Sequence, residues 1–257
     1  MSFDFSEDQP TQKTPPYTQI AAYYDQIMIH VNYPRWAQYV DAIFRKQNFS
    51  FDQPLLDVGC GTGKFLLEMQ KLGYHGDGLD PSAEMLNIAR AALPDSRFLH
   101  GGFPDLPDIP NGKYNLITCL YDSMNYLADE AAFRETLQTV YEKLASPGIF
   151  VFDLVSEFHC KYYFKDYIDS EVLDEDAAYT RESKYDSENK IQQTWVRIYT
   201  PDGVFEEAHE QRIFDFYEIR RMIQKESDFK LLNIYDEFSF DKAGKRTGRG
   251  HFVLKKG

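Results

Sequence analysis

The residues best suited to chemistry lie in one short run, Leu55 to Gly63, which reads LLDVGCGTG. An apolar segment containing Asp57 leads into glycines at alternate positions, and a helical pattern follows directly from Lys64 to Leu72. This order predicts a buried strand, a tight turn and a helix N-terminus. Such an arrangement lets the backbone approach a nucleotide-like ligand closely.

The neighbouring residues distinguish between two ligands that bind turns of this kind, a dinucleotide and S-adenosylmethionine. The dinucleotide fingerprint G-x-G-x-x-G requires glycine at position 64, where this chain has Lys64. The Asp57 carboxylate would repel a pyrophosphate but attract a cationic amino-acid group. Asp80 closes the next apolar stretch, Tyr74 to Leu79, and is placed to accept hydrogen bonds from two ribose hydroxyls. The pattern therefore favours S-adenosylmethionine, although Asp80 could also be an ordinary helix N-cap before Pro81.

These motifs resemble a known family. LLDVGCGTG followed by GLDPSAEML (Gly78 to Leu86) is similar to the cofactor half of the class I S-adenosylmethionine-dependent methyltransferases. Most of the chain resembles a small-molecule branch of that family, which includes antibiotic-sugar N,N-dimethyltransferases and related uncharacterised bacterial methyltransferases. The resemblance implies in-line methyl transfer from S-adenosylmethionine to a nitrogen or oxygen of a small molecule.

The resemblance and the residues together give a set of expected cofactor contacts. Gly102 stands where the family usually has an acidic residue for the adenine amino group, so only a backbone contact remains there. Phe103 could stack on the base or pack in the core. The expected cofactor-binding residues are Tyr17, Tyr24, Trp36, Asp57, Gly59, Cys60, Gly61, Gly63, Asp80, Pro81, Met85, Gly102, Phe103, Leu120 and Tyr121.

Polar residues directly after the predicted strand Leu116 to Leu120 indicate the mouth of a pocket. We expect Asp122 to be catalytic and Asn125 and Tyr126 to bind substrate, with helix capping as the alternative for Asp122. In the family, N-terminal aromatic residues form a lid over the methionine end of the cofactor. Simple packing is the alternative for these aromatic residues, which are Tyr17, Tyr24, Tyr33 and Trp36.

A second group of polar residues lies in the segment Glu207 to Arg212, which reads EAHEQR. On a strand, His209 and Gln211 share one face, and Arg212 lies on the other. His209 could accept a proton or bind substrate, because imidazole titrates near neutral pH, although a single strand histidine is usually structural. Arg212 could hold an acidic substrate group or pair with a carboxylate. The expected catalytic residues are His209, Tyr17 and Asp122, and the expected substrate-binding residues are Tyr33, Asn125, Tyr126, His209 and Arg212.

The elements that must position these residues alternate between strand and helix from Leu55 onward, which predicts an α/β fold with a doubly wound, Rossmann-like, seven-stranded sheet. We expect a helical lid over residues 1–50, with a mobile start up to about residue 16. The methyltransferase domain then comprises 51–155 and 213–257. Between these parts, residues 156–212 alternate apolar and polar residues, which predicts an inserted antiparallel sheet on the substrate side.

Composition excludes several classes of function. The 257-residue chain has 41 acidic and 28 basic residues and a formal net charge of −13, which disfavours nucleic acid and anionic membranes as partners. We expect a soluble cytoplasmic protein, because the N-terminus does not resemble a signal peptide and no apolar run could span a bilayer. No metal is expected, since Cys60, Cys119 and Cys160 lack ligand spacing. RNA methylation and cofactor binding without turnover remain alternatives, and a monomer and a homodimer are equally open.

Overall fold

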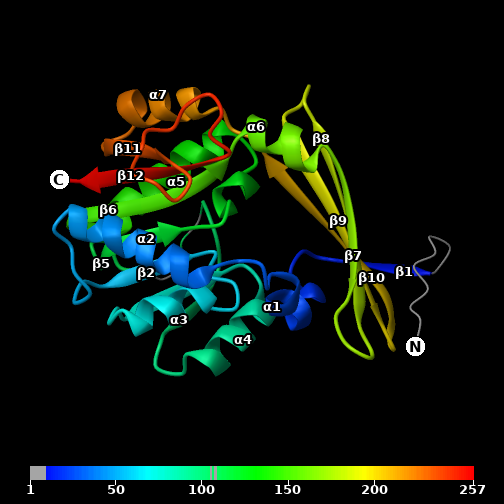
Figure 1. The fold of residues 1–257 in the computed structure, drawn as a ribbon. Helices are drawn as coiled ribbons and strands as arrows, with labels where there is room; N and C mark the ends of the chain where they lie inside the picture. The colour runs from blue at the N-terminus through cyan, green and yellow to red at the C-terminus, as the bar shows by residue number, and fades with distance from the viewer. Residues whose placement is uncertain (1–9, 105, 107–108) are drawn as a thin grey trace.

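The computed structural model describes residues 10–104, 106 and 109–257, and these form two β-sheets (Figure 1). The larger sheet has seven strands in the order β11-β12-β6-β5-β2-β3-β4. β12 runs antiparallel to both of its neighbours, and the remaining pairs are parallel. This confirms the predicted Rossmann-like, seven-stranded sheet. The strands are β2 (Leu55–Val58), β3 (Gly76–Asp80), β4 (Phe98–His100), β5 (Tyr114–Cys119), β6 (Leu144–Val155), β11 (Lys230–Asp236) and β12 (Arg249–Lys256).

Helices cover both faces of this sheet. One face packs against α5 (Glu130–Lys143) and α7 (Phe216–Glu226). The other packs against α2 (Tyr33–Lys46), α3 (Lys64–Lys71) and α4 (Ala83–Ala92). Successive strand residues point to opposite faces, so the apolar runs of the central strands supply both cores.

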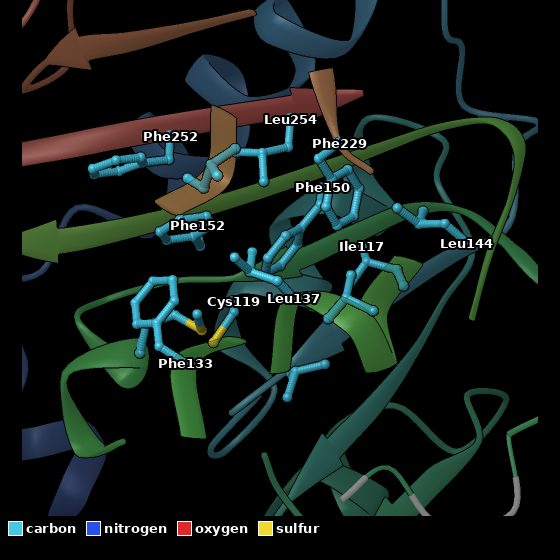
Figure 2. Close-up of a cluster of buried hydrophobic side chains, with 14 of the residues drawn as sticks. Ile117, Cys119, Phe133, Leu137, Leu144, Phe150, Phe152, Phe229, Phe252 and Leu254 are labelled. Carbon is cyan, nitrogen blue, oxygen red and sulfur yellow. The ribbon is translucent and has the colours of Figure 1, made fainter. Parts of the chain in front are cut away.

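Phenylalanine side chains pack together with aliphatic ones in the core beneath α5 and α7 (Figure 2). Phe152 and Phe252 stack with ring centroids 4.8 Å apart, and Phe133 of α5 lies edge-on to Phe152. All three are fully buried. Each such side chain contributes roughly 2–3 kcal/mol by its burial, so this core fixes the central strands that carry the site.

Helices α2, α4, α5 and α7 begin after polar residues whose side chains accept backbone N–H groups. Asn32 caps α2, with Pro34 in the first turn, and Asp129 and Asp215 cap α5 and α7. The cap of α4 is Ser82. This corrects the alternative reading of Asp80 as the N-cap of that helix.

The second sheet stands beside the first and has the order β1-β10-β9-β8-β7 (Figure 1). Its segment of the chain begins with the short helix α6 and the π-helical turn η3, so the first residues of the predicted insertion are helical. Strands β7 to β10 then pair antiparallel, as expected. The elements are α6 (Glu157–His159), η3 (Cys160–Phe164), β7 (Asp166–Val172), β8 (Ala178–Asp186), β9 (Ile191–Thr200) and β10 (Gly203–Arg212).

The N-terminal segment joins this second sheet. Thr11–Thr14 forms β1, which pairs parallel with β10, so the expectation of a mobile start fails for these residues. Backbone groups at the edge of β10 provide hydrogen-bond partners that the sequence of this segment does not reveal. Residues 1–9 lie outside the described part of the chain. The short helices η1 (Ile20–Tyr23) and α1 (Tyr24–Ile27) then lead across to α2.

Within the described residues, none of the helices combines the length and the apolar character that crossing a membrane would require.

Candidate active site

The turn between β2 and α3 exposes its backbone at the carboxyl end of the sheet. Gly59, Gly61 and Gly63 have φ angles of 74°, 55° and 81°, in the left-handed region that favours glycine. A Cβ at Gly59 would lie 2.7 Å from Ser123 Oγ, so only glycine fits there. A Cβ at Gly61 would meet nothing within 4 Å. A ligand can therefore approach the backbone at Gly61 directly.

Asp57 lies at the floor of the site with its side chain buried. Thr118 Oγ1 donates to Asp57 Oδ1 at 2.6 Å. Burial raises the pKa of Asp57 to about 7, against the lowering effect of the Thr118 hydroxyl and with a smaller increase from Asp80. A cation would offset the cost of burying the ionised carboxylate, so the site suits a positively charged group.

Asp80 ends β3 and connects the glycine turn to α4. Its Oδ2 accepts from Gly61 N and its Oδ1 from Ser82 N, each at 2.9 Å. Burial raises the pKa of Asp80, although these two N–H groups lower it. The Asp80 carboxylate is thus bonded directly to the backbone of the glycine turn.

The residues expected near adenine lie in different surroundings in the structure. Gly102 lies against Pro81, since a Cβ at Gly102 would be 3.6 Å from Pro81 Cβ. Met85 is buried in α4, and its backbone N donates to Ser82 Oγ. Phe103 packs on the core, edge-on to Phe150, with centroids 6.4 Å apart. Of the two roles considered for Phe103, the structure therefore shows core packing.

A narrow cleft of about 50 Å³ opens above the glycine turn. It is bounded by the turn, by the end of β5 and by aromatic residues of the N-terminal segment. The predicted residues that line it are Tyr24, Tyr33, Trp36, Asp57, Gly59, Cys60, Gly61, Leu120 and Tyr121, joined by Thr62, Lys64 and Phe65. The structure thus brings most of the expected cofactor residues together.

The N-terminal helices are fixed to the glycine turn through Asp25. Its Oδ1 accepts from Thr62 Oγ1 at 2.7 Å, and its Oδ2 lies 3.1 Å from Lys64 Nζ. Lys64, which stands where the dinucleotide fingerprint has its third glycine, therefore contacts the segment above the cleft. Trp36 extends this cover and packs on Tyr121, with ring centroids 5.9 Å apart.

The chain turns sharply after β5, where Tyr121 and Asp122 have φ angles of 58° and 55°. Two adjacent non-glycine residues in this region are strained, and the surrounding contacts must hold them. Arg249 Nη2 donates to Asp122 Oδ1 at 2.7 Å, and Gln211 Nε2 donates to Asp122 Oδ2 at 2.6 Å. Asp153 Oδ2 accepts from the Asp122 backbone N at 2.9 Å and also from Arg249.

This network changes the expectation for Asp122. Burial lowers the pKa of the Arg249 guanidinium, but the carboxylates of Asp122 and Asp153 outweigh it and raise that pKa well above its ordinary value. Arg249 is therefore a permanent cation, and both Asp122 oxygens are already bonded. The geometry fits a carboxylate that positions its neighbours and does not show a free catalytic base.

Three predicted residues form a hydrogen-bonded row beside the cleft. Tyr17 Oη lies 2.8 Å from Tyr126 Oη, which lies 3.0 Å from His209 Nδ1. His209 Nε2 is 3.6 Å from Glu207 Oε2, close enough for an ion pair when the imidazole is protonated. Burial, and then the neighbouring Tyr126, raise the pKa of Tyr17 well above its ordinary value. Both tyrosines thus remain neutral near pH 7, and the row can relay a proton to His209.

The remaining substrate candidates make backbone contacts instead. Asn125 is fully buried; its Nδ2 donates to Arg212 O at 2.7 Å and its Oδ1 accepts from Val155 N at 3.1 Å. Arg212 Nε donates to Ala128 O at 2.6 Å, and its side chain lines a different surface cleft beside α5 and α7. The structure thus ties β10 to the sheet through these two residues and places neither in the row beside His209.

Sequence reasoning missed several residues that hold the site together. Thr118, Glu207 and Arg249 bond to predicted residues that are 61, 190 and 127 positions away. No local pattern marks such pairs. Ser82 could have been found, because a serine three residues before Met85 in a helical pattern is a normal N-cap.

The site fits S-adenosylmethionine as a cofactor. The buried Asp57 carboxyl, suited to a cation, and the open backbone at Gly61 line one cleft, and the Asp80 carboxylate bonds to that backbone at Gly61 N. Among the described residues, no group of three or more histidine, cysteine or acidic side chains is arranged to hold a metal ion.

Known proteins share both the sequence pattern and the fold. A family described as "Methyltransferase domain" matches residues 55–148. YqeM of Bacillus subtilis strain 168, provisionally named a methyltransferase, is 27% identical over 93% of this chain and 97% of its own. The dTDP-3-amino-3,6-dideoxy-alpha-D-glucopyranose N,N-dimethyltransferase of Streptomyces fradiae is 35% identical over 38% of this chain and 37% of its own. Among solved structures, an S-adenosylmethionine-dependent methyltransferase from Clostridium acetobutylicum ATCC 824 has a TM-score of 0.79 and 24% identity, covering 94% of this chain and 99% of that one.

Proposed function

We propose that this S-adenosylmethionine-dependent methyltransferase methylates a nitrogen or oxygen of a small molecule held between the glycine turn and β10. The observation that carries this proposal is the row Tyr17–Tyr126–His209 beside the cofactor cleft. When bound, S-adenosylmethionine supplies an activated methyl group on a sulfonium. The protein then has to align the acceptor, exclude water and take up the acceptor's proton.

The described side chains suit these tasks. Asp57 attracts the cationic end of the cofactor, and Asp80 and the turn bind its polar groups. Tyr24 and Trp36 line the cleft, Tyr17 packs edge-on against Tyr24, and together these rings keep water out. His209 Nδ1 receives a proton through Tyr126, and Glu207 forms an ion pair with the imidazolium that results. Asp122 positions Gln211 at the edge of the acceptor space.

A small acceptor also agrees with the surface and with the relatives. A net charge of −13 repels RNA, and one of the named relatives is an N,N-dimethyltransferase of a dTDP-linked amino sugar. The free, buried Cys60, Cys119 and Cys160 agree with a reducing, cytoplasmic location.

The test supplies labelled methyl donor and three separate acceptor pools, which are a filtrate of small metabolites, total RNA and total protein. We expect label in the filtrate alone, and label in RNA would overturn the proposal.

With the acceptor that the filtrate yields, His209→Asn should lower turnover about 100-fold while the affinity for S-adenosylhomocysteine changes less than about threefold. Glu210→Gln, on the exposed face of the same strand, is the matched control and should behave as wild type.

A further inference from the structure

Glu207 makes an unusual set of contacts with the N-terminal segment. Its side chain is fully buried on β10. Its Oε1 accepts from the backbone N–H groups of Thr18, Gln19 and Ile20 at 3.1, 2.7 and 3.0 Å, and its Oε2 accepts from that of Tyr17 at 2.6 Å. One carboxylate of the second sheet thus satisfies the N–H groups that lead into η1, as a helix cap would.

Tyr17 is held from the opposite side as well. Its carbonyl oxygen accepts from Ser82 Oγ at 2.7 Å, and the backbone N of Ser82 donates to Asp80 Oδ1 at 2.9 Å. A continuous path of hydrogen bonds therefore runs from Asp80 on the cofactor side to Glu207 on the acceptor side. Tyr17 has a φ of 61°, a backbone conformation that costs free energy for a non-glycine residue. The hydrogen bonds to Glu207 and Ser82 must offset this cost.

The cleft beneath this segment is too small for the cofactor as it stands. Its volume is about 50 Å³, whereas pockets for ligands of this size measure roughly 300–1,000 Å³. Tyr24, which belongs to the same N-terminal segment as Tyr17, lines the cleft. The segment must therefore move outward to admit a ligand.

We propose that Glu207 is a positioning residue that latches residues 17–27 over the cofactor cleft, so that cofactor exchange requires its hydrogen bonds to open. The proposal rests on the cofactor placement proposed above and goes beyond it. It gives the second sheet control over the methyl donor as well as contact with the acceptor.

The side chain can be altered in graded steps. Glu207→Gln keeps the length and one oxygen but loses the charge, and Glu207→Asp keeps the charge but cannot reach as far. Glu210→Gln on the exposed face is the matched control. Dissociation of S-adenosylhomocysteine can be followed by stopped-flow fluorescence of Trp36, which lines the cleft, in a Trp195→Phe background that removes the second of the two tryptophans. We expect the dissociation rate to rise about tenfold in Glu207→Gln and further in Glu207→Asp, with no change in the control.

Trypsin reports on the latch without any ligand, because Lys13 in β1 lies shortly before the held segment, which begins at Tyr17. Cleavage at Lys13 should be about tenfold faster in Glu207→Gln than in Glu210→Gln, and S-adenosylhomocysteine should protect the wild type much more than the variant. If the Glu207 variants do not fold, Ser82→Ala removes the opposite anchor of Tyr17 and should accelerate both processes.

Equal dissociation and cleavage rates in Glu207→Gln and the control would overturn the latch, even if the variant melts at a lower temperature. A purely structural role would give that result. The acceptor takes no part in these measurements, so failure of the latch and failure of the proposed acceptor class are distinguishable.

Discussion

The cofactor side and the acceptor side of the site are built in different ways. On the cofactor side, Asp57, the glycine turn, Asp80 and Ser82 lie within residues 57–82 and bond mainly to one another or to adjacent strands. On the acceptor side, Tyr17 and Tyr126 are 109 positions apart and Tyr126 and His209 are 83 apart. A contiguous motif specifies backbone geometry, whereas the acceptor side depends on how the two sheets and the N-terminal segment meet. Substitutions on the acceptor side should therefore affect stability over a wide region, and those in the motif should affect ligand binding.

The largest effect should come from Arg249→Met on the acceptor side. This change leaves Asp122 and Asp153 without their buried cation, and removing one partner of a buried ion pair costs about 3–5 kcal/mol. Urea denaturation should show this loss in the free energy of unfolding. Arg246→Met, at an exposed position in the loop that precedes β12, should change that free energy by less than about 0.5 kcal/mol. Equal midpoints in the two variants would contradict the role assigned to Arg249.

Asp57→Asn should have the next largest effect, confined to ligand binding. The amide keeps the shape but cannot neutralise a cation, so affinity for S-adenosylmethionine should fall about 100-fold, which corresponds to about 2.7 kcal/mol. Calorimetry measures the affinity, and a thermal melt should show no loss of stability because a costly buried carboxyl is removed. Asp95→Asn, at an exposed position, is the control. An affinity loss below threefold would remove Asp57 from the cofactor site.

The pH dependence of S-adenosylmethionine binding tests the role of the Asp57 carboxylate as well. With a pKa of about 7, Asp57 holds a proton at pH 6 and is mostly ionised at pH 8. A cationic ligand binds the ionised form, so binding below pH 7 releases a proton and affinity rises with pH. The expected gain is about tenfold between pH 6 and pH 8, seen by calorimetry in buffers of different ionisation enthalpy. A flat profile in the wild type, or an equal slope in Asp57→Asn, would show that another group controls binding.

The smallest effect is expected for Lys64→Gly, which restores the spacing of the dinucleotide fingerprint. The carboxylates of Asp57 and Asp80 remain, so the variant should show no binding of nicotinamide dinucleotides at millimolar concentration. Loss of the partly exposed ion pair with Asp25, together with a glycine at the helix start, should lower the free energy of unfolding by about 1 kcal/mol or less. Dinucleotide binding by this variant would mean that glycine spacing, rather than charge, selects the ligand.

The sequence by itself determined the cofactor side. Alternating strands and helices predicted the elements of the seven-stranded sheet, and three glycines between a strand and a helix predicted the turn, because each element and the turn depend on neighbouring residues. The cleft likewise gathers Tyr24, Trp36 and Tyr121, which the family resemblance had indicated.

Only the tertiary structure decided the acceptor side. It placed Asn125 and Arg212 on backbone groups, bound Asp122 to Arg249, and joined Glu207 to the start of the chain. Each of these polar side chains had several possible partners in the sequence. A buried polar group bonds to whichever partner the packing brings within reach, and that partner lies far away along the chain. The roles of these residues therefore depend on burial and on long-range pairing, which no local sequence pattern encodes.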